Sequence, residues 1–207
     1  MSRSRSASPP LGVRGGLAWA VAGVIVCLLI AAVSALVGRS HRTVGTDPVA
    51  AVAVATGPLE PLFRPIAGFT FGDLSSPVVA QMHAAVRAVQ ADPELRGAFT
   101  EVAGRSVLDH GSSVALVVAL RVDDRYASRP GFDRSFLSGL TRARGPTTET
   151  VILGGRRVVR VADAEGTAAL IFYDRGLAVF VGGADDATVL EHVMEGVLRN
   201  VGDVTRS

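Results

Sequence analysis

An apolar run lies near the amino terminus of this chain, from Leu17 to Val37. The run holds 21 residues without a charge, and the uncharged interval between Arg14 and Arg39 is 24 residues long. A helix of that length spans about 36 Å, which exceeds the roughly 30 Å thickness of the hydrocarbon core of a bilayer. Because a lone segment in lipid must satisfy its own backbone polar groups, the sequence predicts one transmembrane helix over residues 15–38.

The arginines around this run predict its orientation. Three arginines precede the run and two follow it. The positive-inside bias therefore places residues 1–14 in the cytoplasm as a basic tail and the carboxy-terminal part of the chain outside the cytoplasm. The alternative is a secretory signal peptide that is cleaved near Val33-Ser34-Ala35. The run is longer than the core of about 7–15 residues that signal peptides have, which favours a retained anchor.

Beyond the anchor the sequence predicts a linker and one folded domain. Residues 39–61 contain Gly45, Pro48, Gly57, Pro58 and Pro61 around a Val-Ala run, and this composition is typical of a linker. Residues 62–203 are left for folded structure, which is the size of one ordinary domain.

Hydrophobic periodicity predicts both helices and strands in that domain. We expect helices over 76–90, 132–142 and 185–200, and a further short helix that starts at Asp92. The apolar run 114–122 predicts a strand covered on both faces, and 147–182 predicts a three-stranded β-meander. Similarity of 102–107 to 153–158 raises the possibility of two hairpin-plus-helix units. Two such units side by side would give an α+β domain, an antiparallel sheet with helices packed on one face.

Charge and cysteine content exclude several classes of protein. The sequence pI of about 9.3 would suit a nucleic-acid-binding protein, but residues 1–59 carry five Arg against one Asp, whereas residues 60–207 carry 16 Arg against 18 acidic residues. The basic excess therefore flanks the membrane segment, and the domain has no basic field for a phosphate backbone. Its lone cysteine, Cys27, lies within the apolar run, so the domain cannot depend on disulfides or a thiolate nucleophile.

Two stretches contain residue types that can carry chemistry. Asp109-His110-Gly111-Ser112-Ser113 has the components of a hydrolase triad, but neighbours in a turn point apart, so we interpret the stretch as a hairpin turn. Glu191, His192 and Glu195 have the spacing of a metal-binding helix face. The apolar positions of the same helix predict that these three side chains are solvated, and no further ligands are evident. We therefore expect no catalytic residues, no metal and no cofactor.

Arg156, Arg157 and Arg160 are the candidate binding residues. Together they could form a small basic edge for an acidic partner. The alternative is that they form the solvent side of a strand or protect an exposed sheet edge.

The layout as a whole resembles that of bacterial single-pass membrane proteins with a short basic tail and a small extracytoplasmic domain. All 21 basic residues are arginine, which is typical of GC-rich bacterial coding. The resemblance implies a membrane-tethered, non-catalytic domain that binds a partner protein, an envelope component or a small ligand. The alternatives are an envelope hydrolase or metal-assisted enzyme, and a carrier of apolar ligands.

Overall fold

The computed structural model describes residues 57–93, 95–142, 147–162, 168–184 and 186–204. The predicted cytoplasmic tail, the predicted transmembrane helix and most of the predicted linker lie outside the described residues. Within the described part of the chain, no helix is both long enough and apolar enough to cross a membrane.

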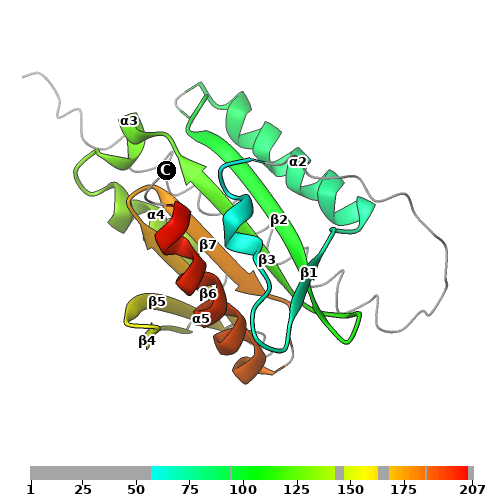
Figure 1. The fold of residues 1–207 in the computed structure, drawn as a ribbon. Coiled ribbons are helices and arrows are strands. Elements are labelled where there is room, and N and C mark those ends of the chain that lie inside the picture. The colour runs from blue at the N-terminus through cyan, green and yellow to red at the C-terminus, as the bar shows by residue number, and fades with distance from the viewer. Residues whose placement is uncertain (1–56, 94, 143–146, 163–167, 185, 205–207) are drawn as a thin grey trace, which may run out of the picture.

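A seven-stranded sheet forms the centre of the domain, with the strand order β1-β2-β3-β7-β6-β5-β4 (Figure 1). All neighbouring strands are antiparallel. The strands are β1 (Thr70–Gly72), β2 (Phe99–Asp109), β3 (Ser112–Val122), β4 (Thr147–Leu153), β5 (Arg156–Ala162), β6 (Ala168–Asp174) and β7 (Leu177–Gly182). The predicted α+β class with an antiparallel sheet is thus confirmed. The prediction of a three-stranded meander over 147–182 is wrong in number, because β4, β5, β6 and β7 pair consecutively in that range.

The helices of the described chain are short or amphipathic. They are the 3-10 helix η1 (Glu60–Phe63) and the α-helices α2 (Ser76–Ala91), α3 (Asp124–Ala127), α4 (Phe132–Arg142) and α5 (Ala187–Val204). The predicted helices at 76–90, 132–142 and 185–200 correspond to α2, α4 and α5. The predicted helix from Asp92 is wrong, because backbone bonds from Leu95 to Asp92 and from Ala98 to Leu95 turn the chain directly into β2.

Helices cover both faces of the sheet, which corrects the prediction of helices on one face. Strand β3 shows the reason, because its apolar residues alternate between two separate hydrophobic clusters: Leu116, Val118 and Leu120 join one, while Ala115 and Val117 join the other. Helices α2, α3 and α4 cover the first cluster, and η1 and α5 cover the second. Figure 1 shows η1 and α5 in front of the sheet and α2 behind it. A strand with apolar residues on both faces requires cover on both.

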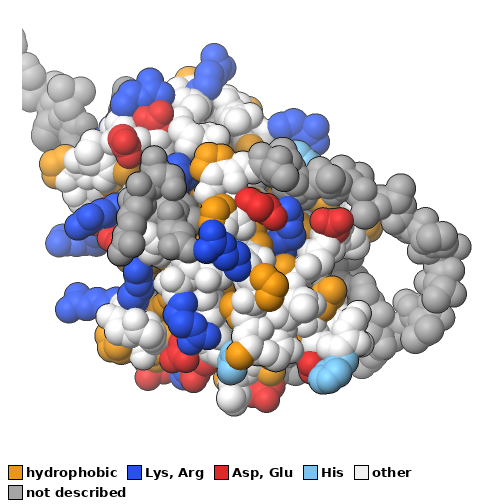
Figure 2. Space-filling model, in the orientation of Figure 1, with side chains coloured by type: hydrophobic (Ala, Val, Ile, Leu, Met, Phe, Trp, Pro, Cys, Tyr) orange, Lys and Arg blue, Asp and Glu red, His pale blue; other side chains and the backbone are white. Residues whose placement is uncertain are grey.

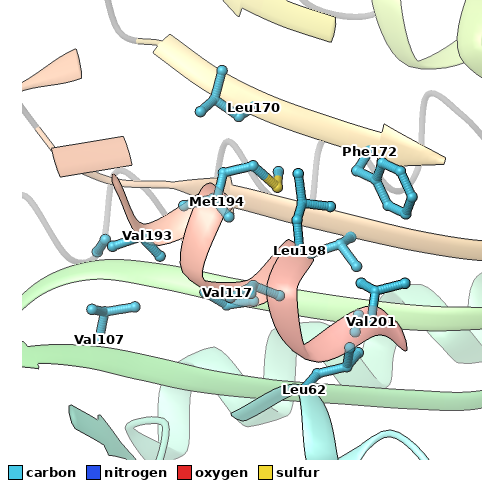
Figure 3. Close-up of a cluster of buried hydrophobic side chains, with 14 of the residues drawn as sticks. Leu62, Val107, Val117, Leu170, Phe172, Val193, Met194, Leu198 and Val201 are labelled. Atoms are coloured by element: carbon cyan, nitrogen blue, oxygen red, sulfur yellow. The ribbon is translucent and has the colours of Figure 1, made fainter. Parts of the chain in front are cut away.

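Helix α5 supplies most of the cover on its face. Its apolar stripe includes Val193, Met194, Val197, Leu198 and Val201, each at most 3% exposed. Figure 3 shows this stripe among side chains from η1, β2, β3 and β6, with Leu170 and Phe172 in the upper part of the view and Val107 and Leu62 in the lower part. Burial of five such side chains contributes on the order of 10 kcal/mol of transfer free energy, before the entropy cost of folding is subtracted.

A hydrogen bond and an ion pair connect β2 to η1 and to the residue before it. The carboxylate of Glu101 accepts a hydrogen bond from the backbone N–H of Leu59 at 2.9 Å, and Arg105 forms an ion pair with Glu60 at 2.9 Å. The side chain of Leu59 is fully buried. Leu59 and Glu60, which the sequence assigned to the linker, thus belong to the packed domain.

The two segments that suggested a repeat differ in conformation. Residues 102–107 lie within the single strand β2, whereas residues 153–158 cross the turn between β4 and β5. Gly154 and Gly155 have φ angles of +54° and +75° at that turn. These two segments are therefore not equivalent in structure.

Candidate functional site

The three arginines predicted to bind a partner all lie on β5, but they do not form one edge. Side chains alternate along a strand, so Arg156 and Arg160 share the face of Val158, which α5 covers, while Arg157 lies on the opposite face. Arg160 forms ion pairs with Glu149 of β4 and Glu191 of α5. The charge of Arg160 is thus compensated by two carboxylates of the domain itself.

Arg156 and Arg157 instead help to line a hollow at one end of the sheet. We call this the arginine hollow; it has a volume of about 530 Å³, and its lining residues are Arg156, Arg157, Phe172, Tyr173, Asp174 and Arg175. The register of the sheet explains the convergence. Val158 of β5 pairs with Phe172 of β6, so the start of β5 runs beside the end of β6, and two turns meet there. Figure 2 shows arginine side chains along this side of the molecule, at the left of the view.

One arginine of the hollow is positioned by an aromatic ring, and another by a turn. The guanidinium carbon of Arg156 lies 5.5 Å from the centre of the Phe172 ring, a cation–π arrangement. Arg175 occupies the turn between β6 and β7 with a φ angle of +46°, an uncommon conformation for a residue with a side chain. Arg175 is the third arginine that lines the hollow.

Tyr173 lines the hollow with a phenol that stays uncharged. Its ring packs against Phe132 and Phe136, with ring centres 6.0 Å and 5.0 Å away, and its hydroxyl oxygen is buried without a hydrogen bond among the described residues. Burial raises the pKa of Tyr173 far above its usual range, and the nearby charges of Asp133 and Asp174 act in the same direction. The phenol therefore stays protonated and is not available as a base at neutral pH.

The charge balance of the hollow favours anions. Three arginines line it against one acidic residue, Asp174, which leaves a net charge of +2. Guanidinium groups bind carboxylates and phosphates through paired hydrogen bonds. The hollow contains no histidine, serine, threonine or cysteine that could act as a nucleophile or proton carrier. The groups that line it are therefore suited to holding an anion.

The sequence missed Phe172, Asp174 and Arg175 as site residues. Residues 174–176 were apparent as a turn between two strands, but only the pairing of β5 with β6 brings that turn to Arg156 and Arg157. A sequence signal existed in the placement of arginines at both turns, although nothing in the chain order indicates that the two turns lie at the same end of the sheet.

The stretch from Asp109 to Ser113 is the turn of the β2–β3 hairpin, as interpreted. Nδ1 of His110 lies 2.7 Å from Oδ1 of Asp109, and the histidine side chain is 94% exposed. Its φ angle of +49° belongs to the turn. Because an exposed pair between sequence neighbours lacks an oriented nucleophile, the geometry offers no triad.

In the second stretch, on α5, Glu191 and His192 contact different parts of the domain. Glu191 is engaged with Arg160, and Nε2 of His192 lies 3.0 Å from the carbonyl oxygen of Ala67, with its ring against Phe69. No group of three or more potential metal ligands occurs in the part of the chain that the structure describes.

A second, smaller depression lies between α2 and β2. Met82, Val86, Phe99 and Val102 are its apolar residues, and its volume is about 220 Å³. Pockets for drug-sized ligands usually measure about 300–1,000 Å³, so this depression is too small for a lipid chain. The apolar-carrier alternative finds no support in it.

Comparisons with protein-family models, curated proteins and solved structures found no match for this chain.

Proposed function

We propose that this protein is a membrane-tethered, non-catalytic domain outside the cytoplasm that binds an acidic partner through the arginine hollow. The observation that carries the proposal is the convergence of Arg156, Arg157 and Arg175 from two separate turns on one hollow of about 530 Å³. The partner is a protein, an envelope component or a small ligand that presents carboxylates or phosphates.

The cation–π contact supports a binding role for the hollow. Because Arg156 rests on Phe172, less side-chain entropy is lost when an anion binds to it than for a freely rotating arginine. Arg160 on the same strand, by contrast, has carboxylates of its own. The domain thus separates one structural arginine from those that remain available for a partner.

The tether is supported by the sequence alone. The uncharged run from Leu17 to Val37 is long enough to span a bilayer, and the preceding arginines favour a cytoplasmic amino terminus. Protease treatment of intact cells, compared with lysed cells, tests this part of the proposal. Loss of the domain in intact cells, with a membrane-bound remnant, is the expected result; protection of the domain would contradict it, and a shortened soluble product would indicate a cleaved signal.

The binding part is tested with an acidic peptide as the probe. We expect the full chain in detergent to bind a poly-glutamate peptide in a salt-dependent manner, and the double variant Arg156→Gln/Arg157→Gln to bind about tenfold more weakly. Two exposed ion pairs at about 0.7 kcal/mol each give this factor.

The matched control removes two exposed charges elsewhere. Arg87 of α2 and Arg199 of α5 are both exposed and lie outside the hollow. Arg87→Gln/Arg199→Gln has the same net charge as the test variant, so equal weakening in both would show that only overall charge matters and would refute a site at the hollow.

A further inference from the structure

Strand β4 forms one outer edge of the sheet and is largely uncovered. It pairs with β5 over its whole length, from Thr147 to Leu153, and with no other described strand. Five of its seven residues are exposed. One of them, Ile152, is 63% exposed and is the exposed large hydrophobic residue of the described chain. Figure 1 shows β4 at the outer side of the sheet, next to β5.

This edge lacks the features that usually prevent strand pairing between molecules. The opposite edge, β1, is only three residues long. Strand β4 has seven residues, runs without a bulge against β5 and contains no proline, glycine or basic residue. Its sequence, Thr-Thr-Glu-Thr-Val-Ile-Leu, has high β-propensity, and its one charge, Glu149, is paired with Arg160. Long regular edges of this kind are templates for another strand.

We infer that β4 pairs antiparallel with β4 of a second copy of this chain, which joins the two sheets into one. A two-fold axis perpendicular to the sheet keeps each face on its own side, so residues that pair must share a face. The register centred on Val151 meets this condition. It places Val151 opposite Val151, Thr150 opposite Ile152, and Glu149 opposite Leu153.

This register is complementary in both shape and charge. Each exposed Ile152 gains a neighbouring strand on which to pack, with Thr150 of the other copy opposite. Glu149 of one copy comes beside Leu153 of the other, whose partner on β5 is Arg156 on the same face. Each carboxylate thus approaches an arginine of the other copy, and no like charges are opposed. This self-complementarity is why the second copy is the occupant and not a different protein.

Cysteine cross-linking tests the pairing in the full chain. Because Val151 lies on the axis, Val151→Cys in a Cys27→Ser background places two thiols opposite each other. The Cα atoms of opposed residues in antiparallel strands are about 4.5–5.5 Å apart, within the range that a disulfide requires. Mild oxidation in membranes should give a covalent homodimer at least tenfold faster than for Thr70→Cys, a matched control on the exposed opposite edge.

A second variant acts through the edge itself. Ile152→Lys adds an exposed charge to β4, and natural edge strands use such charges to avoid pairing. The substitution should slow cross-linking of Val151→Cys at least tenfold, whereas Thr70→Lys should leave the rate unchanged. Equal cross-linking at positions 151 and 70, a covalent product with another protein, or an Ile152→Lys variant that cross-links at the original rate would each overturn the inference. Arg156 contributes to both surfaces, but cross-linking at position 151 is measured without an acidic peptide, so failure of the pairing is distinguishable from failure of the proposed function.

Discussion

Helix α5 contains two glycines whose substitution by alanine should have opposite effects. A Cβ atom at Gly196 would lie 2.6 Å from Cγ2 and 2.8 Å from Cβ of Ile66, which belongs to the segment after η1. A Cβ atom at Gly202 would meet nothing within 4 Å. The helix and its backbone geometry are shared, so the pair separates the effect of packing from that of helix propensity.

The expected magnitudes follow from these distances. Alanine in place of glycine within a helix stabilises by about 1 kcal/mol, and Gly202→Ala should show most of this gain. Gly196→Ala has the same gain but forces a branched, buried side chain to move, which costs about 1–3 kcal/mol. We therefore expect Gly196→Ala to be about 1 kcal/mol less stable than the natural protein and about 2 kcal/mol less stable than Gly202→Ala.

Pulse proteolysis of the full chain across a urea series measures this difference. With a slope of about 2 kcal/mol per M, the unfolding midpoints of the two variants should differ by about 1 M. Ile66→Ala removes Cγ2 and Cδ1 of the obstructing side chain but keeps its Cβ, so Gly196→Ala should be less destabilising in that background than in the natural protein, a coupling that a double-mutant cycle detects. If Gly196→Ala is as stable as Gly202→Ala in the natural background, the packing of Ile66 against α5 is refuted.

Three further predictions concern single side chains. Oδ1 of Asp186 accepts a hydrogen bond from the backbone N–H of Thr188 at 2.8 Å, so Asp186→Ala should destabilise the domain by about 1 kcal/mol in the same assay, and an unchanged midpoint would exclude a capping role. Glu60→Gln leaves Arg105 buried without its carboxylate. Because Glu60 is 40% exposed, we expect the free energy of unfolding to fall by only about 1–2 kcal/mol. Recovery of stability in Glu60→Asp would show that the loss is due to the missing charge. The raised pKa of Tyr173 means that the unfolded phenol ionises first, so stability present below pH about 10 should fall as the pH rises further, and it should fall less in Tyr173→Phe; parallel pH profiles would contradict this.

Local signals predicted most of the secondary structure. The apolar spacing of 76–90 and 132–142 reproduces α2 and α4, and Gly154-Gly155 marks the turn between β4 and β5, where both residues have positive φ angles. These features depend on residues within a few positions of one another, which is why the sequence reveals them. The prediction of a helix from Asp92 was wrong although a local helix-start signal is present, because the chain turns immediately to enter β2.

The candidate site was predicted only in part. Arg156 and Arg157 were expected to bind a partner and do line the arginine hollow, while Arg160 was grouped with them and lies in an internal ion-pair network. Because side chains alternate between the two faces of a strand, the sequence of β5 could have shown that Arg157 lies on the opposite face from Arg156 and Arg160. It could not have shown that Glu191, 31 residues later in the chain, neutralises Arg160.

The α+β class and the positions of the main helices and strands could be predicted from the sequence, which also predicts a membrane anchor and no nucleic-acid partner, because each of these inferences depends on composition or on short-range periodicity. Tertiary structure alone decided that helices cover both faces, that two distant turns build one hollow, and that β4 is left as an uncovered edge. Those properties depend on strand order, and strand order is set by long-range pairing such as that of β3 with β7, which no local pattern encodes.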